Sequence, residues 1–130
     1  IEYLKENQIE DTFCFLGYQE NPYQYISACD LFVCSSYKEG FSTAATEALI
    51  VGTPVMVTQC SGMREMLGDN EYGLIVENSD NGIYKGLKKF MDDEEFLKYF
   101  KEKSTIRGRF FRKEERVKDI EEMIINLIKE

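Results

Sequence analysis

The sequence contains no histidine, which removes the commonest general base and the usual Ser-His and Cys-His nucleophile pairs. None of its four cysteines forms a Cys-x-x-Cys pair, so no spacing supports a zinc site, and we expect neither a bound metal nor a cofactor. Cys14 and Cys34 lie in apolar, strand-like runs and are predicted to be buried as small hydrophobic residues. Such unpaired cysteines indicate a reducing compartment, and we expect a cytoplasmic protein.

No apolar run is long enough to span a bilayer, and we expect no signal peptide. Basic residues are in the minority, since 16 lysines and arginines stand against 24 aspartates and glutamates, giving a formal net charge of -8. This charge argues against nonspecific binding to nucleic acid or to an anionic membrane. The 130 residues suffice for one domain at most. Because the first residue is Ile1, we expect this chain to be part of a longer protein.

Short apolar runs alternate with stretches of helical periodicity. Four runs are predicted to be strands: residues 12–16, 31–34, 54–58 and 73–76. The runs are continuous rather than alternating, and helical stretches separate them, as in a parallel sheet covered on both faces. The sequence therefore predicts an α/β fold, a Rossmann-like doubly wound parallel sheet with helices on both faces. In such a sheet, ligands bind beyond the carboxyl ends of the strands.

Helix boundaries are marked by capping residues. Asn21-Pro22 predicts a helix start, followed by the inward-facing positions Tyr23, Ile26 and Cys29. Ser42 predicts the cap of a helix over residues 43–51, and a short helix is predicted over 63–67. Helices are also predicted from about residue 83 onward, including 94–130. Their apolar stripes comprise Ile83, Leu87, Phe90 and Met91, then Phe96, Leu97 and Phe100, then Val117, Ile120, Met123, Ile124, Leu127 and Ile128.

Two glutamates, Glu39 and Glu47, flank the predicted start of the helix after Ser42. Unpaired amides and the helix dipole make such a start an anion site, and Gly40 allows a ligand to approach the backbone closely. Glu47 is too far along the helix to cap it and suits neutral hydroxyls, such as a ribose diol. Glu39 could accept hydrogen bonds from hydroxyls at the other end of the same ligand. Alternatively, both carboxylates face water, and spacing alone favours this second interpretation.

An ordered set of motifs carries a resemblance to a known family. Glu39-Gly40-Phe41 followed by Glu47 is similar to the glutamate-pair signature of the family-four retaining glycosyltransferases of GT-B fold. The flanking stretches "FLGYQENPYQYISACDLFVCSS", "EALIVGTPVMVT", "SGMREMLGDNEYGLIV" and "NSDNGIYKGLKKF" resemble that family in the same order, from about residue 13 to about residue 90. The resemblance implies a partial C-terminal domain of a GT-B fold, comprising residues 1–130 without its first strands.

The resemblance also implies roles for single residues. A catalytic Glu39 would contact hydroxyls of the transferred sugar, and Glu47 would hold the ribose. The remaining implied binding residues are the backbone of Gly40, Phe41 and Ser42 for sugar or diphosphate, and Gly17 and Tyr18 for the base. Ser61 and Gly62 are left open between a site border and a simple turn. The basic side chains that grip the diphosphate in the family have no clear counterpart, since only Arg64 and Lys38 lie near the expected site.

The implied function is retaining transfer of a sugar from a UDP, GDP or ADP sugar to a saccharide or lipid-linked acceptor, without a metal. This chain would supply the donor-binding half and be inactive alone, with any membrane proximity arising from the missing half. One alternative is a sugar-nucleotide 2-epimerase of the same fold, against which the lack of histidine argues. Another is a non-catalytic domain that binds nucleotide or serves as an interaction surface through its last helix.

The family's strand order 3-2-1-4-5-6 gives a further expectation about the sheet. Residues 12–16 would be its third strand, and the strands containing Val33, Val55 and Ile75 would be the fourth, fifth and sixth. Two central strands would then be missing. We therefore expect the first strand to pair directly with the Val33 strand, a second copy to fill the gap, or upstream residues to do so.

Overall fold

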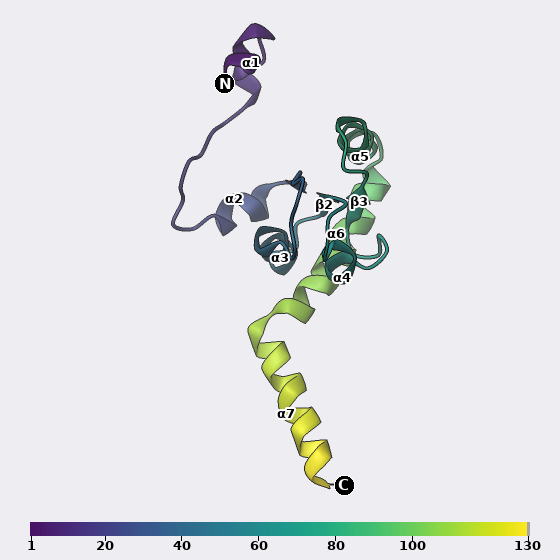
Figure 1. The fold of residues 1–130 in the computed structure, drawn as a ribbon. Helices are drawn as coiled ribbons and strands as arrows, with labels where there is room; N and C mark the ends of the chain where they lie inside the picture. The colour runs from purple at the N-terminus through teal and green to yellow at the C-terminus, as the bar shows by residue number, and fades with distance from the viewer. Residues whose placement is uncertain (130) are drawn as a thin grey trace.

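The computed structural model describes the backbone of residues 1–129 and the side chains of residues 1–126, except 115, 116 and 119. The elements follow in the order α1 (Glu2–Glu6), the 3-10 turn η1 (Glu10–Thr12), α2 (Tyr23–Ala28), β1 (Phe32–Cys34), α3 (Thr43–Ile50), β2 (Val55–Thr58), α4 (Met63–Leu67), β3 (Leu74–Val76), α5 (Asp80–Asp92), α6 (Glu94–Phe111) and α7 (Lys113–Lys129). Figure 1 shows α1 standing apart from a central body, and α7 projecting away from that body.

The three strands form one parallel sheet in the order β1-β2-β3. Phe32 of β1 lies opposite Val55 of β2, and Met56 of β2 lies opposite Leu74 of β3. As predicted, the strands containing Val33, Val55 and Ile75 therefore lie side by side in chain order. The central strand β2 is buried along its whole length, as expected for a strand covered on both faces.

Helices cover both faces of this sheet, which confirms the predicted layers. On one face, Val55 and Val57 pack with buried side chains of α3 and α4. On the other face, Met56 packs with Phe90 of α5 and Phe100 of α6. The alternation along β2 follows from the geometry of a strand, because successive side chains point to opposite faces. Both layers hold the carboxyl ends of the strands in fixed positions.

Helix α6 joins the two layers. Gly108 lies so close to α3 that a Cβ there would overlap the carbonyl oxygen of Leu49, so a larger residue would push the helices apart. Arg107 donates hydrogen bonds of 2.8 Å from Nε to the carbonyl of Met66 and from Nη2 to that of Glu65. These carbonyls belong to the last turn of α4, where no N–H group of the helix donates a hydrogen bond to them. The long helix α6 thus fixes both α3 and α4.

The predicted strand at residues 12–16 does not form. Thr12 ends the 3-10 turn η1, and residues 13–16 form no regular element. Phe13 and Phe15 are 53% and 68% exposed, and the predicted burial of Cys14 is wrong. A strand exists only through pairing, and within residues 1–129 nothing pairs with this segment or with the outer edge of β1. Direct pairing with the Val33 strand is therefore wrong. Figure 1 shows the segment running along the outside toward α1.

The predicted positions of helices α2, α3 and α4 are confirmed, but two of the predicted side-chain directions in α2 are wrong. Ser42 caps α3 as predicted, and α4 spans the predicted residues. Helix α2 begins at Tyr23, whose N–H donates to Asn21 Oδ1 at 3.2 Å. Ile26 packs against the core, but Tyr23 and Cys29 are exposed, so their predicted inward direction is wrong.

The predicted stripes of the later helices are buried only in part. Phe90 and Phe100 are core residues, whereas Met91 is 83% exposed, contrary to the prediction. The described apolar residues of the α7 stripe are exposed to solvent: Val117, Ile120, Met123 and Ile124. Leu127 and Ile128, which also belong to the predicted stripe, lie outside the described side chains. No helix within residues 1–129 combines the length and the apolar character needed to cross a bilayer.

Candidate functional site

The start of α3 follows the carboxyl end of β1 after an eight-residue loop, and it presents free backbone amides. Ser42 is buried, and its Oγ accepts a hydrogen bond of 3.3 Å from the N–H of Ala45. Thr43 and Ala44 precede that amide and are exposed. The first amides of a helix have no acceptor within the helix, so those of Thr43 and Ala44 face solvent. Together with the helix dipole, they form an anion-binding position.

Glu39 lies in the loop between β1 and α3 and is half-buried. Its Oε2 accepts a hydrogen bond of 2.8 Å from Ser36 Oγ and a weaker one of 3.5 Å from Cys34 Sγ. Among the described side chains, nothing donates to its Oε1. The carboxylate is therefore anchored through one oxygen and keeps the other available as an acceptor.

Glu47 lies in the second turn of α3 and is also half-buried. Its Oε1 accepts a hydrogen bond of 3.1 Å from the hydroxyl of Tyr23 on α2. This hydrogen bond and the negative charge of Glu47 raise the pKa of the Tyr23 phenol above its ordinary value of 10.0. Tyr23 therefore remains a protonated donor at neutral pH. Sequence reasoning missed this pairing because Tyr23 was expected to face the core.

Gly62 brings a second loop against the Glu39 loop. It has a φ of 80°, and a Cβ there would overlap the carbonyl oxygen of Gly40. Only glycine combines this left-handed conformation with so close a backbone approach. Gly62 therefore packs directly against the backbone at Gly40, and whether it also borders a ligand stays a prediction.

Asn78, which sequence reasoning did not select, lies two residues beyond β3 and contacts the loop that carries Glu39. Its Nδ2 lies 3.3 Å from the carbonyl oxygen of Ser36, 3.1 Å from that of Tyr37 and 3.4 Å from that of Gln59. These carbonyls belong to the loops that follow β1 and β2. A polar residue directly after a predicted strand end was the available signal, because the carboxyl ends of parallel strands meet at one edge.

Two pockets open at this edge of the sheet. One of about 470 Å³ is lined by Gln59, Cys60, Ser61, Gly62, Arg64 and Ile75. The other, of about 390 Å³, is lined by Ser35, Tyr37, Asn78, Ser79, Asp80 and Ile83. Neither lining includes Glu39 or Glu47. The two glutamates also share no hydrogen-bond partner among the described residues, so their joint action on one ligand stays a prediction.

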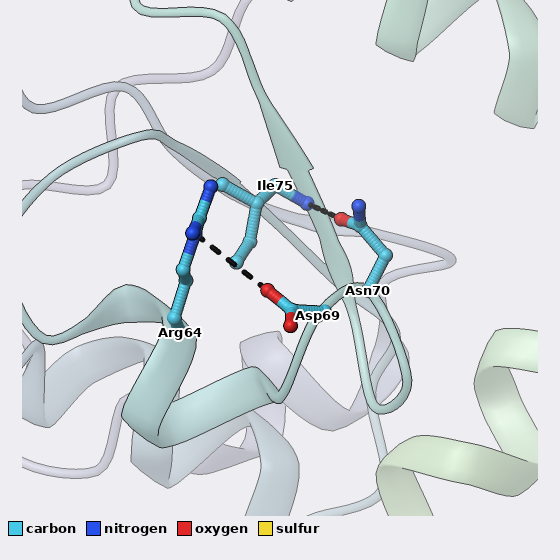
Figure 2. Close-up of polar contacts among 4 residues, drawn as sticks. All are labelled: Arg64, Asp69, Asn70 and Ile75. Atoms are coloured by element: carbon cyan, nitrogen blue, oxygen red, sulfur yellow. Dashed lines mark hydrogen bonds and ion pairs between the residues drawn. The ribbon is translucent and has the colours of Figure 1, made fainter.

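Arg64 contributes a positive charge to the lining of the first of these pockets. Its Nε lies 3.6 Å from Asp69 Oδ1, and both side chains are largely exposed (Figure 2). Beside this pair, Asn70 Oδ1 accepts a hydrogen bond of 2.6 Å from the N–H of Ile75, which fixes the turn between α4 and β3. Exposed ion pairs contribute little energy, so Arg64 can exchange Asp69 for another anion.

The residues predicted to border the base are not brought to this edge by contacts in the structure. Tyr18 is 91% exposed, and apart from Gly17 and its two chain neighbours no residue has an atom within 4 Å of the Cβ position of Gly17. Their binding role stays a prediction. Within the described residues, no group of three or more histidine, cysteine or acidic side chains is arranged to hold a metal ion.

Comparison of the sequence with known protein families gives a match to the family described as "Glycosyl transferases group 1" over residues 1–107. Among curated proteins, the chain is 38% identical over 112 residues to the N-acetylgalactosamine-N,N'-diacetylbacillosaminyl-diphospho-undecaprenol 4-alpha-N-acetylgalactosaminyltransferase of Campylobacter jejuni, covering 85% of this chain and 31% of that protein. It is 30% identical over 96 residues to the N-acetyl-alpha-D-glucosaminyl L-malate synthase of Bacillus anthracis, covering 73% of this chain and 25% of that protein.

Solved structures show the same fold. The sucrose-phosphate synthase of Thermosynechococcus elongatus superimposes with a TM-score of 0.80 at 24% identity, covering 98% of this chain and 33% of that one. HepE of Anabaena, solved in complex with UDP, superimposes with a TM-score of 0.80 at 19% identity, covering 98% of this chain and 35% of that one. The chain thus spans about a third of the length of these structures and a third or less of the curated relatives.

Proposed function

The chain belongs to the group 1 glycosyltransferases, and from this premise we propose that it is the donor-binding part of a retaining transferase. The complete enzyme transfers a sugar from a nucleotide-diphosphate sugar to a saccharide or lipid-linked acceptor. The observation that carries this proposal is the exposed amino end of α3 after the carboxyl end of β1, with one anchored carboxylate before it and one after it in the chain.

The free amides of Thr43 and Ala44, with the backbone of residues 40–42, would bind the diphosphate. As the bond to the sugar breaks, negative charge grows on the leaving diphosphate, and fixed amide dipoles stabilise this charge without having to reorient. In this proposal no metal is needed for that step. Arg64 could add a positive charge, because its exposed ion pair with Asp69 is weak.

The two glutamates would bind the ends of the same donor. The open oxygen of Glu39 would accept hydrogen bonds from hydroxyls of the transferred sugar, and that of Glu47 from the ribose. A carboxylate that is already oriented loses less rotamer freedom when the ligand binds. The UDP in the HepE complex supports a nucleotide donor for this chain.

The acceptor would bind outside this chain. Transfer needs two substrates held across a cleft, and this chain spans about a third of its relatives. The diphospho-undecaprenol in the name of the Campylobacter relative supports a lipid-linked saccharide as the acceptor class. We also propose a cytoplasmic location for this part of the enzyme, because its four cysteines are free, as is typical of a reducing compartment.

The test is a mutational comparison in the full-length protein, with UDP, GDP and ADP sugars as the donor panel. Glu39→Gln should lower turnover, because the neutral amide is a weaker acceptor of sugar hydroxyls. Glu47→Ala should mainly weaken donor binding, by about 1–3 kcal/mol in isothermal titration. Glu102→Ala serves as the matched control, because Glu102 is an exposed glutamate on α6.

Three outcomes would count against the proposal. The full-length protein could bind and turn over none of the panel. Glu39→Gln and Glu47→Ala could both retain the kinetics of the Glu102→Ala control, which would refute the assigned roles. A structure with bound donor could also place Glu47 on the side of α3 away from the ligand, which would end the two-carboxylate arrangement.

A further inference from the structure

The carbonyl oxygen of Ser36 collects hydrogen-bond donors from the ends of the other two strands. Thr58 Oγ1, at the last position of β2, donates to it, and Cys60 Sγ lies 3.1 Å away. Asn78 Nδ2, two residues beyond β3, lies 3.3 Å away. A carbonyl oxygen has two lone pairs, so three donors saturate it. The backbone at Ser36 is therefore held from β2 and β3 at once.

The side chain of Ser36 extends this arrangement to Glu39. Its Oγ donates to Glu39 Oε2 at 2.8 Å, and the Cys34 thiol supports the same oxygen more weakly at 3.5 Å. Ser36 and Glu39 are both half-buried. Hydrogen bonds to an ionised acceptor are stronger than neutral ones, especially where water is partly excluded. The rotamer of Glu39 is thus fixed before any ligand arrives.

We propose that Ser36 is a positioning residue for Glu39, and that Asn78 and Thr58 fix the backbone from which Ser36 acts. The proposal rests on the role of Glu39 in the proposed function. A free glutamate side chain rotates about three bonds, and a ligand would have to select one rotamer on binding. The Ser36 hydroxyl makes this selection beforehand and leaves the second carboxylate oxygen open toward sugar hydroxyls.

A positioning role and a purely structural role of the Ser36 hydroxyl predict different results. If the contacts only stabilised the fold, loss of the Ser36 hydroxyl would lower the melting temperature and leave turnover per folded molecule unchanged. If the hydroxyl positions Glu39, turnover falls while the fold persists, because the backbone carbonyl of Ser36 keeps its three donors. Affinity for the nucleoside diphosphate without its sugar should not change, since Glu39 contacts only the sugar in this scheme.

The experiment uses Ser36→Ala in the full-length protein, with the active sugar nucleotide of the UDP, GDP and ADP panel. We expect kcat to fall about tenfold or more, the equivalent of one hydrogen bond to a charged group. Binding of UDP, GDP or ADP alone should stay unchanged. Ser36→Thr, which keeps a hydroxyl, should restore part of the turnover. Ser27→Ala is the matched control, because the exposed Ser27 hydroxyl donates only to a carbonyl within α2.

The outcomes separate this proposal from the proposed function. If Glu39→Gln lowers kcat and Ser36→Ala does not, the positioning role is wrong and the donor-binding role stands. If Glu39→Gln leaves kcat unchanged, or no sugar nucleotide is turned over, the proposed function fails and this proposal fails with it. If Ser36→Ala does not fold, Asn78→Ala decides: a folded Asn78→Ala protein with undiminished kcat overturns the proposal, and a reduced kcat supports it.

Discussion

Gly62→Ala should destabilise the protein by more than the usual cost of replacing a glycine in the left-handed conformation with another residue. With a φ of 80°, an L-residue at this position costs roughly 1–2 kcal/mol. The new methyl group would also overlap the carbonyl of Gly40 and lie 3.6 Å from the nitrogen of Phe41. Because these are backbone atoms, the loops after β1 and β2 must separate, an overpacking cost of about 1–3 kcal/mol. The expected total is about 2–5 kcal/mol.

Gly52→Ala is the matched control for this prediction. Gly52 has a φ of 81°, but a Cβ there would lie 3.2 Å from Thr105 Oγ1, a side-chain atom that can rotate away. Urea unfolding followed by circular dichroism should show a loss of roughly 1–2 kcal/mol for Gly52→Ala and a clearly larger loss for Gly62→Ala. Donor affinity in the full-length protein should fall only for Gly62→Ala. Equal losses of stability would refute the inferred contact between the two loops.

The remaining predictions concern Tyr23, Met56 and the isolated chain. Glu47→Gln should lower the raised pKa of Tyr23 toward its ordinary value, as measured by NMR of ¹³C-labelled tyrosine; an unchanged pKa would contradict the hydrogen bond between them. Because the folded-state pKa of Tyr23 is raised, its contribution to stability is fully present below pH 10.0 and is lost as the pH rises through the folded-state pKa. Met56→Ala should cost about 2–5 kcal/mol in urea unfolding, because Met56 of β2 is fully buried against α5 and α6, whereas Met91→Ala on the exposed face should cost almost nothing. The isolated 130 residues should show no sugar transfer in a radiolabelled-donor assay, and any measurable transfer would prove that expectation wrong.

The central fold was predictable because its signals are local and agree with one another. Ser42 and Gly52 mark both ends of α3, and the continuous apolar run at 55–57 marks a strand covered on both faces. Residues 12–16 carry an equally apolar pattern, yet the strand is absent because pairing depends on a neighbour that no local pattern specifies. Met91 was misassigned for a related reason: one position beyond Phe90 turns a helical side chain by about 100°, out of the interface with α6.

The site was predictable only where its residues are neighbours in sequence. Glu39 and the amides after Ser42 belong to one short stretch, so their proximity could be expected from the helix start alone. Asn78 reaches carbonyls about 40 residues away, and Tyr23 reaches Glu47 across 24 positions. Such contacts depend on how α2 and β3 dock onto the sheet. A single sequence contains no measure of that docking, so these partners emerged only from the structure.

The partners of the two glutamates support their assignment to neutral hydroxyls. Each receives one hydroxyl donor, Ser36 for Glu39 and Tyr23 for Glu47, and in the described part of the chain neither forms an ion pair with lysine or arginine. A hydroxyl orients a carboxylate without neutralising it, so each site keeps its negative charge. A phosphate would be repelled from both, whereas the amides of Thr43 and Ala44 between them would attract it. In the proposed complex, the order of hydroxyl, diphosphate and hydroxyl along a sugar nucleotide then matches the order of carboxylate, helix start and carboxylate along this chain.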